Sequence, residues 1–206
     1  MSAKKGQHQL KEAIRIMREP ATKYFTDRKE WREWLRANFE IEDEIWLEYP
    51  LKKTGRKRIL YNDAVEEALC FGWIDSTIKS LEKHKETSIQ RFCKRRKDST
   101  FSQPNIERLK WLFENNFIHN SIKENVSKLI QQEFFFPKDI LKCLESNNIV
   151  WHNYQEFSEP YKRIRIAYIE SARKRPEEFQ KRLNNFINKT KENKQIKGFG
   201  GIDKYY

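Results

Sequence analysis

Two groups of side chains are suited to catalysis or ligand binding, and the first consists of Trp73 and Asp75. Both lie in the apolar stretch EALCFGWIDS, residues 67–76. An apolar indole wall disfavours the charged form of a nearby carboxyl, which raises its pKa and makes it a candidate general base. The alternative is structural, because Asp75 could equally pair with Arg91 or Arg95 and join two strands. The residues alone leave both interpretations open.

The second group lies at residues 91–105 and leads into a predicted helix N-terminus. It consists of Arg91, Arg95, Ser99, Ser102 and Asn105. Arginine forks, hydroxyls and the first amides of a helix together form a cradle for an anion. Alternatively, the loop caps the helix and its arginines form internal ion pairs. If the strands through residues 73–76 and 91–95 are neighbours, the two groups meet in one cleft.

Recognised catalytic and metal-binding motifs are absent from the sequence. It contains no nucleophile elbow, no phosphate-binding glycine loop and no HExxH pattern. Cys70, Cys93 and Cys143 are not paired with histidines at the spacing of a zinc site. We therefore expect no catalytic residue, no metal site and no cofactor.

The charge of the chain favours anionic partners. It has 42 Lys and Arg against 30 Asp and Glu, a net charge of +12. Basic residues cluster at 52–58, 91–97 and 162–175, and on one shared face they would bind phosphates, as in a nucleic-acid-binding protein. The alternative is that these runs are ordinary solvated surface. Since no apolar run is long enough for a membrane span or a signal peptide, we expect a cytoplasmic protein.

The N-terminal half contains patterns of helices and strands that would position both groups. Residues 27–39 predict a helix with Trp31 and Leu35 on one face, and Asp27 and Glu30 resemble a capping box. Strands are predicted at 44–50, 59–61, 73–81 and 86–96, the last two antiparallel. A basic turn surrounds Gly55, and a second helix runs from an Asn62 cap to a stop at Gly72.

The C-terminal half is predicted to be helical. Pro104 and Pro176 mark helix starts, with further helices at about 120–132, 137–147 and 160–173. The predicted fold is α+β, a small antiparallel sheet covered by helices and followed by a mostly helical half. The expected divisions are a polar lead-in (1–24), an α+β domain (25–102), a helical region (103–195) and a flexible tail (196–206).

Several segments, in order, resemble the bacterial YdeI/OmpD-associated family, also described as bacteriocin-protection proteins. They are FTDRKEWREWL (25–35), EIWLEYPLKK (44–53), EEALCFGWIDS (66–76), QRFCKRRKDSTFSQPNIERLKWL (90–112) and IESARKRPEEFQKRL (169–183). The chain departs from the family pattern at Lys94, where Pro is usual, and at Phe101, where Trp is usual. The resemblance implies a link to antimicrobial-peptide or envelope-stress resistance and implies no established reaction.

Together these observations predict a non-enzymatic cytoplasmic binding or stress-protection protein with a basic and aromatic cleft. The ligand is an anionic small molecule or peptide, and the oligomeric state is left open. The predicted binding residues are Trp46, Lys53, Trp73, Asp75, Arg91, Arg95, Ser99, Phe101 and Asn105. The alternatives are a nucleic-acid-binding protein that uses its basic face and an enzyme of unknown reaction that uses Asp75.

Overall fold

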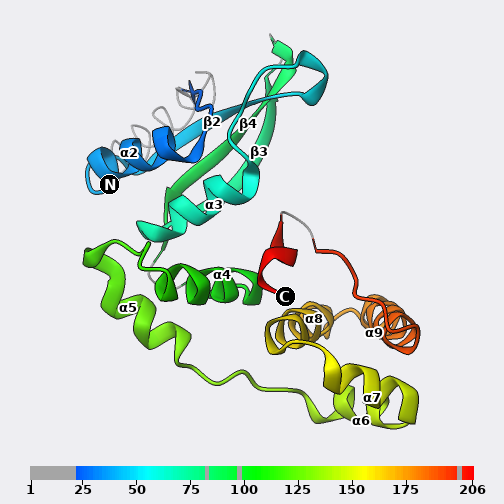
Figure 1. Ribbon diagram of the computed structural model, residues 1–206. Helices are drawn as coiled ribbons and strands as arrows, with labels where there is room; N and C mark the ends of the chain where they lie inside the picture. The colour runs from blue at the N-terminus through cyan, green and yellow to red at the C-terminus, as the bar shows by residue number, and fades with distance from the viewer. Residues whose placement is uncertain (1–21, 82–83, 97–98, 199–200) are drawn as a thin grey trace, which may run out of the picture. The chain divides into compact units, whose positions relative to one another are not determined.

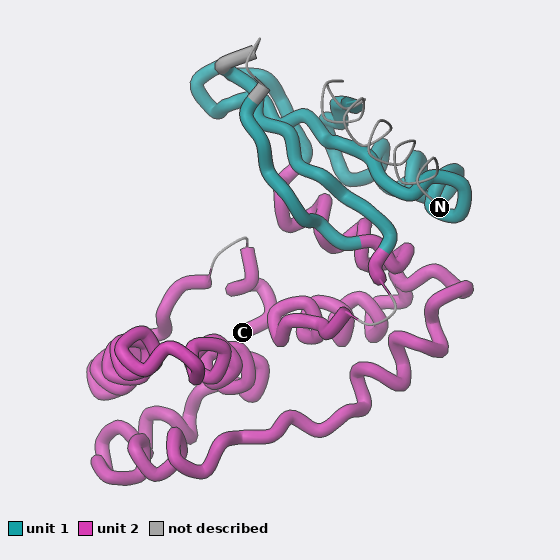
Figure 2. Tube along the Cα trace, turned by 180° about the vertical axis from the view of Figure 1, so that it is seen from behind, with its two compact units in different colours: residues 1–59, 74–94 teal, residues 60–73, 95–206 magenta. Residues whose placement is uncertain are grey.

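A computed structural model describes residues 22–81, 84–96, 99–198 and 201–206. The expectation of a polar lead-in therefore falls almost wholly outside the described residues. The chain forms two compact units (Figure 2), one made of residues 1–59 and 74–94 and the other of residues 60–73 and 95–206. The predicted α+β class is confirmed, and the C-terminal half is mostly helical, as expected.

The first unit contains a four-stranded sheet in the order β1-β2-β4-β3. Its strands are β1 (Thr22–Lys23), β2 (Glu44–Pro50), β3 (Trp73–Leu81) and β4 (His84–Lys94). β2 and β4 pair antiparallel, whereas the very short β1 pairs parallel to β2. The sheet is therefore mixed rather than purely antiparallel. Helix α2 (Arg28–Asn38) supplies the crossover that parallel neighbours need (Figure 1).

Helix α2 packs on the sheet through its predicted apolar face. Trp31 and Leu35 are fully buried, and the rings of Trp31 and Phe92 of β4 have centroids 5.5 Å apart. The predicted cap is present, because Asp27 accepts hydrogen bonds from the backbone N–H groups of Lys29 (3.0 Å) and Glu30 (3.1 Å). The start of α2 and its buried face therefore follow directly from the local sequence.

The basic segment after β2 differs from the prediction. Residues Lys52–Thr54 form the 3₁₀ helix η1, which ends at Gly55 with a left-handed φ of 65°. The predicted strand at 59–61 is wrong, because Tyr61 already begins helix α3 (Tyr61–Cys70). Ile59 is buried, and its N–H donates to the carbonyl oxygen of Phe25 rather than to a strand partner.

Helix α3 belongs to the second unit and ends as predicted, since Gly72 follows it with a left-handed φ of 74°. Its start was predicted incorrectly, because the N-cap is Leu60 and Asn62 lies inside the helix. The Asn62 amide instead donates to Glu66 Oε1 (2.7 Å) and accepts from Arg108 Nε (3.0 Å). Asn62 thus connects α3 to the following helix.

The remaining helices of the second unit are α4 (Gln103–Glu114), α5 (Asn120–Ile130), α6 (Lys138–Glu145), α7 (Asn148–Glu156), α8 (Glu159–Glu170) and α9 (Pro176–Lys191). The sequence predicted all of these except α7. Helix α7 contributes Val150 and Tyr154 to a core shared with α6, α8 and α9. Helix α4 contacts α3, α5 and α8, and it is therefore central to the unit.

A buried ion pair joins α4 to α8. Arg163 Nε and Nη2 donate to the two carboxylate oxygens of Glu107 at 2.7 and 2.8 Å, and Glu107 is only 3% exposed. Gln103 adds a third bond to this carboxylate at 2.7 Å. The two-pronged geometry is the favourable arrangement for an arginine and a carboxylate.

The end of the chain is docked on the second unit, although the sequence predicted a flexible tail over residues 196–206. Ile202 and Tyr205, both in the 3₁₀ helix η2 (Ile202–Tyr205), are buried. Lys204 Nζ lies 2.8 Å from Glu66 Oε1, and the Tyr205 hydroxyl donates to the same oxygen. The tail aromatics thus cover a carboxylate that is itself fully buried.

Candidate functional site

Four of the predicted binding residues come together around the loop that follows β4. Trp73, Arg95, Ser99 and Phe101 all line one cavity of about 400 Å³, which we call the Arg95 cavity. Its apolar wall comes from α3, α4 and α5 through Leu69, Leu109, Ile122, Val126 and Leu129. Arg96 and Asn125 complete its polar lining.

Arg95 is held in place by neutral groups. Its backbone N–H donates to the carbonyl oxygen of Gly72 (3.1 Å), which fixes the loop against the end of α3. The guanidinium carbon lies 3.6 Å from the centroid of the Phe101 ring, and Nη2 donates to the carbonyl oxygens of Ser99 (3.3 Å) and Thr100. Phe101 therefore supports the guanidinium through a cation–π contact.

The charge of Arg95 is not balanced within the part of the chain that the structure describes. It forms no ion pair with a described carboxylate, and its buried Nε has no hydrogen-bond acceptor. Burial lowers the pKa of Arg95, but an arginine this basic remains charged. Arg96 also lines the cavity and no acidic side chain among the described residues does, so these residues favour an anion.

Ser99 and Asn105 are occupied by local hydrogen bonds. The Ser99 hydroxyl donates to the carbonyl oxygen of Arg96 at 2.8 Å. Asn105, on the first turn of α4, accepts from Arg108 Nη1 at 2.9 Å and does not line the Arg95 cavity. These bonds order the loop and the helix start.

The other predicted residues lie in the first unit. Arg91 Nε donates to Glu44 Oε2 (2.9 Å). Burial lowers the pKa of Arg91, but this bond and the charge interactions with Cys93 and Glu44 together outweigh burial and raise it. Lys53 pairs with Glu86 at 3.1 Å. Trp46 is 6% exposed, with Lys79 Nζ 5.0 Å from its ring centroid.

Asp75 is half-buried on β3 and lines neither the Arg95 cavity nor the larger cavity described below. Of the predicted residues, Trp73, Arg95, Ser99 and Phe101 thus share a cavity, whereas the others lie outside it. Trp46, Asp75 and Arg91 are on strands of the sheet, Lys53 is in η1 and Asn105 is on α4.

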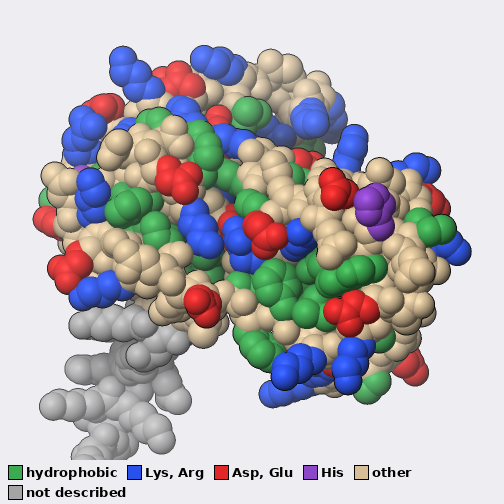
Figure 3. Space-filling model, turned by 60° about the horizontal axis from the view of Figure 1, so that its bottom comes forward, with side chains coloured by type: hydrophobic (Ala, Val, Ile, Leu, Met, Phe, Trp, Pro, Cys, Tyr) green, Lys and Arg blue, Asp and Glu red, His purple; other side chains and the backbone are tan. Residues whose placement is uncertain are grey.

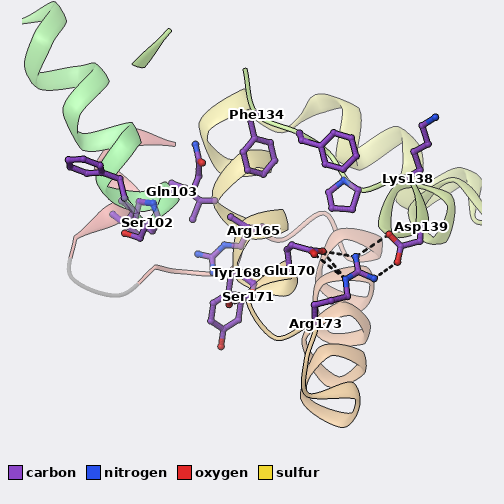
Figure 4. Close-up of a pocket in the computed structure, with 17 residues that line it drawn as sticks. Ser102, Gln103, Phe134, Lys138, Asp139, Arg165, Tyr168, Glu170, Ser171 and Arg173 are labelled. Carbon is purple, nitrogen blue, oxygen red and sulfur yellow. Dashed lines mark hydrogen bonds and ion pairs between the residues drawn. The ribbon is translucent and has the colours of Figure 1, made fainter. Parts of the chain in front are cut away.

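The structure contains a second and larger cavity, which the sequence did not predict. It has a volume of about 910 Å³ and lies between the start of α4, residues 134–139 and helix α8 (Figure 4); we call it the α8 groove. Phe101 lines both cavities. The sequence feature that could have indicated this cavity is the run FFFP at residues 134–137. Its three phenylalanines lie outside any helix, and Phe135 is 74% exposed.

Half of the six basic residues at 162–175 form ion pairs within the fold. Lys162 pairs with Glu159 (2.9 Å), Arg163 pairs with Glu107, and Arg173 pairs with Asp139 and Glu170. The number of basic residues in this run therefore overstates the positive charge that is available to bind a nucleic acid. On the face seen in Figure 3, hydrophobic side chains gather between mixed acidic and basic ones.

Within the described residues, no cluster of histidine, cysteine and carboxylate side chains is suited to hold a metal ion. No helix in the described part of the chain is long and apolar enough to cross a membrane.

Comparisons with known proteins divide the chain at about residue 130. Residues 23–125 match a family described as "Domain of unknown function (DUF8412)". Residues 133–193 match the family described as "Bacteriocin-protection, YdeI or OmpD-Associated". The resemblance seen in the sequence is thus confirmed for residues 133–193, whereas its earlier segments fall in the other family's region. No curated protein and no solved structure gives a significant match.

Proposed function

We propose that this chain, which belongs to the DUF8412 family and whose residues 133–193 match the bacteriocin-protection, YdeI or OmpD-associated family, is a binding protein with a protective role. Its ligand is a small molecule or peptide group with an anionic head on a compact apolar body. The Arg95 cavity is the proposed site. The family description supports protection against antimicrobial peptides or envelope stress as the setting.

The observation that carries this proposal is the unbalanced charge of Arg95 inside an apolar cavity. Taking a charged group out of water is unfavourable unless an opposite charge or hydrogen bonds replace the water. Ser99 and Thr100 supply two carbonyl acceptors and leave Nε without one. A bound carboxylate or phosphate would supply the missing acceptor and the missing charge, at about 1.5–3 kcal/mol for a charge-assisted hydrogen bond.

The dimensions of the cavity define the rest of the ligand. About 400 Å³ lies near the lower end of the range for small-molecule pockets. Trp73 and the aliphatic side chains of α5 present an apolar surface opposite the arginines. The ligand therefore carries a single ring or a short branched chain next to its anionic group.

A thermal-unfolding screen with matched probes tests the proposal. Phenyl phosphate and benzoate should raise the melting temperature, whereas benzyl alcohol, which has the ring without the charge, should not. At a ligand concentration of 100 times Kd the stabilisation is about 2.7 kcal/mol, or roughly 5–10 °C for a chain of this size.

The matched variants are Arg95→Met and Arg36→Met. Arg36 lies on the exposed side of α2 and pairs with Glu33. The Arg95→Met protein should lose the shift, and the Arg36→Met protein should keep it. A shift that survives in Arg95→Met, or that benzyl alcohol reproduces, would rule out the Arg95 cavity as the anion site.

A further inference from the structure

We propose that the α8 groove is a second ligand site, distinct from the Arg95 cavity although Phe101 lines both, and that it binds an amphipathic carboxylate with a longer apolar chain. Its volume of about 910 Å³ is near the upper end of the range for small-molecule pockets. None of its described lining residues belongs to the first unit.

The charges that line the groove do not cancel. Its two carboxylates, Asp139 and Glu170, both bind Arg173, with Arg173 Nη2 3.1 Å from Asp139 and Arg173 Nε 3.1 Å from Glu170 (Figure 4). Lys138 and Arg165 also line the groove, and neither pairs with a carboxylate anywhere in the described residues. An excess of positive charge therefore remains after the internal pairs are formed.

Arg165 gives the anion a defined place. It is only 8% exposed, and Nη2 donates to neutral oxygens, the carbonyl of Ile196 (2.6 Å) and the hydroxyl of Tyr206. Its Nε is buried without an acceptor among the residues that the structure describes. A buried arginine with only neutral partners and an unused donor is suited to a ligand carboxylate.

The N-terminus of α4 also favours an anion close to Arg165. Ser102 and Gln103 line the groove together with Arg165 (Figure 4), and no side chain caps this helix. The Gln103 amide is bound to Glu107 and does not compete for a ligand. The partial positive charge at the N-terminus of a 12-residue helix therefore adds to that of Arg165.

The apolar part of the groove lies beside this basic end. Phe134, Phe135 and Pro137 form one side, and Ile164, Ala167 and Tyr168 of α8 form the other. Phe135 and Tyr168 are 74% and 51% exposed. A chain laid along this lining would cover part of their exposed surface, and this favours an acyl-like body over a small compact ring.

Calorimetric titration with decanoate, below its micelle concentration, tests the proposal. The comparison probes are decanol, with the same chain and no charge, and decyltrimethylammonium, with the opposite charge. We expect decanoate to bind about 10- to 100-fold more tightly than decanol, because a hydrogen bond from the arginine to a carboxylate is stronger than one to a neutral hydroxyl. Decyltrimethylammonium should not bind.

Single substitutions test whether decanoate binds in the α8 groove. Phe135→Ser should weaken decanoate binding roughly tenfold through lost apolar contact, and because Phe135 is exposed its replacement leaves the fold intact. Ile149→Ser is the matched control, since Ile149 is 57% exposed on α7 and lies outside the groove. Arg165→Met should abolish the preference for decanoate over decanol. If that variant fails to fold without its tail contacts, Lys138→Met gives the smaller change in the same direction.

Three results would overturn the proposal: equal binding of decanol and decanoate, equal effects of Phe135→Ser and Ile149→Ser, or no binding of decanoate at its solubility limit. The Arg95→Met protein should bind decanoate normally, and loss of binding there would place the carboxylate in the Arg95 cavity instead. Failure of this site is thus distinguishable from failure of the proposed function.

Discussion

Four arginines of this protein differ in the partners that their guanidinium groups meet. Arg91 and Arg163 each meet a carboxylate through two nitrogens and join separate elements of the fold. Arg95 and Arg165 meet only carbonyl or hydroxyl oxygens, and each has a buried Nε without an acceptor in the described chain. The first two maintain the structure, and the second two mark the two proposed ligand sites.

The Glu107–Arg163 pair should make stability depend on pH. Burial alone would raise the pKa of Glu107, but the bonds from Arg163 and Gln103 outweigh burial and lower it. A carboxyl whose pKa is lower in the folded state stabilises the fold above its unfolded pKa of about 4.3, and this contribution disappears as pH falls through the folded value. Glu107→Gln should therefore cost about 2–4 kcal/mol at pH 7 and progressively less below pH 4.

Urea unfolding of both proteins across this pH range measures the effect. Glu124→Gln is the control, because the Glu124–Lys128 pair is exposed on α5 and should contribute close to nothing. A cost of Glu107→Gln that stays constant down to pH 3 would contradict the argument.

At the scale of elements, the sequence was sufficient wherever a local pattern determines the outcome. The helix after Asp27, strands β2 and β3, and the helix starts at Pro104 and Pro176 were predicted from capping residues and periodicity. Helix α7 was missed because its burial depends on α6, α8 and α9. The strand predicted at 59–61 failed because Tyr61 is recruited into α3.

The aromatic residues of the tail left docking open as an alternative to a flexible tail, and the docked tail gives a test of its own. Ile202 is 3% exposed, and its burial depends on residues far away in the sequence. Ile202→Ala should destabilise the protein by about 2–4 kcal/mol in urea unfolding, as large-to-small core substitutions do. Ile149→Ala, at a 57% exposed position, should change stability by less than about 0.5 kcal/mol. Similar values for both would mean that the tail is not docked in solution.

At the scale of the whole molecule, the units do not follow the order of the chain. The chain passes between them near residues 59, 73 and 94, and the second unit spans both family regions. Trp73 and Arg95 share a cavity with Leu129 through this folding of the chain. The sequence indicated Trp73, Arg95 and Phe101 of the Arg95 cavity but not Arg96 and not the wall in α5. It gave no indication that Trp46, Lys53, Asp75 and Arg91 belong to the first unit.

Separation of the chain at residue 130 should therefore disrupt the fold, even though the family regions divide there. The cut separates Glu107 from Arg163 and Glu66 from Lys204. We expect fragments 1–130 and 131–206 to lack the cooperative thermal transition of the full chain when measured separately by circular dichroism. Two independent, sharp transitions that together reproduce the spectrum of the full chain would contradict this account.

The most direct test of the central claim is to observe the Arg95 side chain while an anion binds. In protein labelled with ¹⁵N-arginine, the Nε–Hε resonance of Arg95 is assigned by its disappearance in Arg95→Lys. Titration with phenyl phosphate should shift this resonance saturably, whereas that of Arg91, already bound to Glu44, should stay in place. An Arg95 resonance that remains unmoved while other arginines shift, or that benzyl alcohol moves equally, would contradict the proposal that Arg95 binds the anionic head of the ligand.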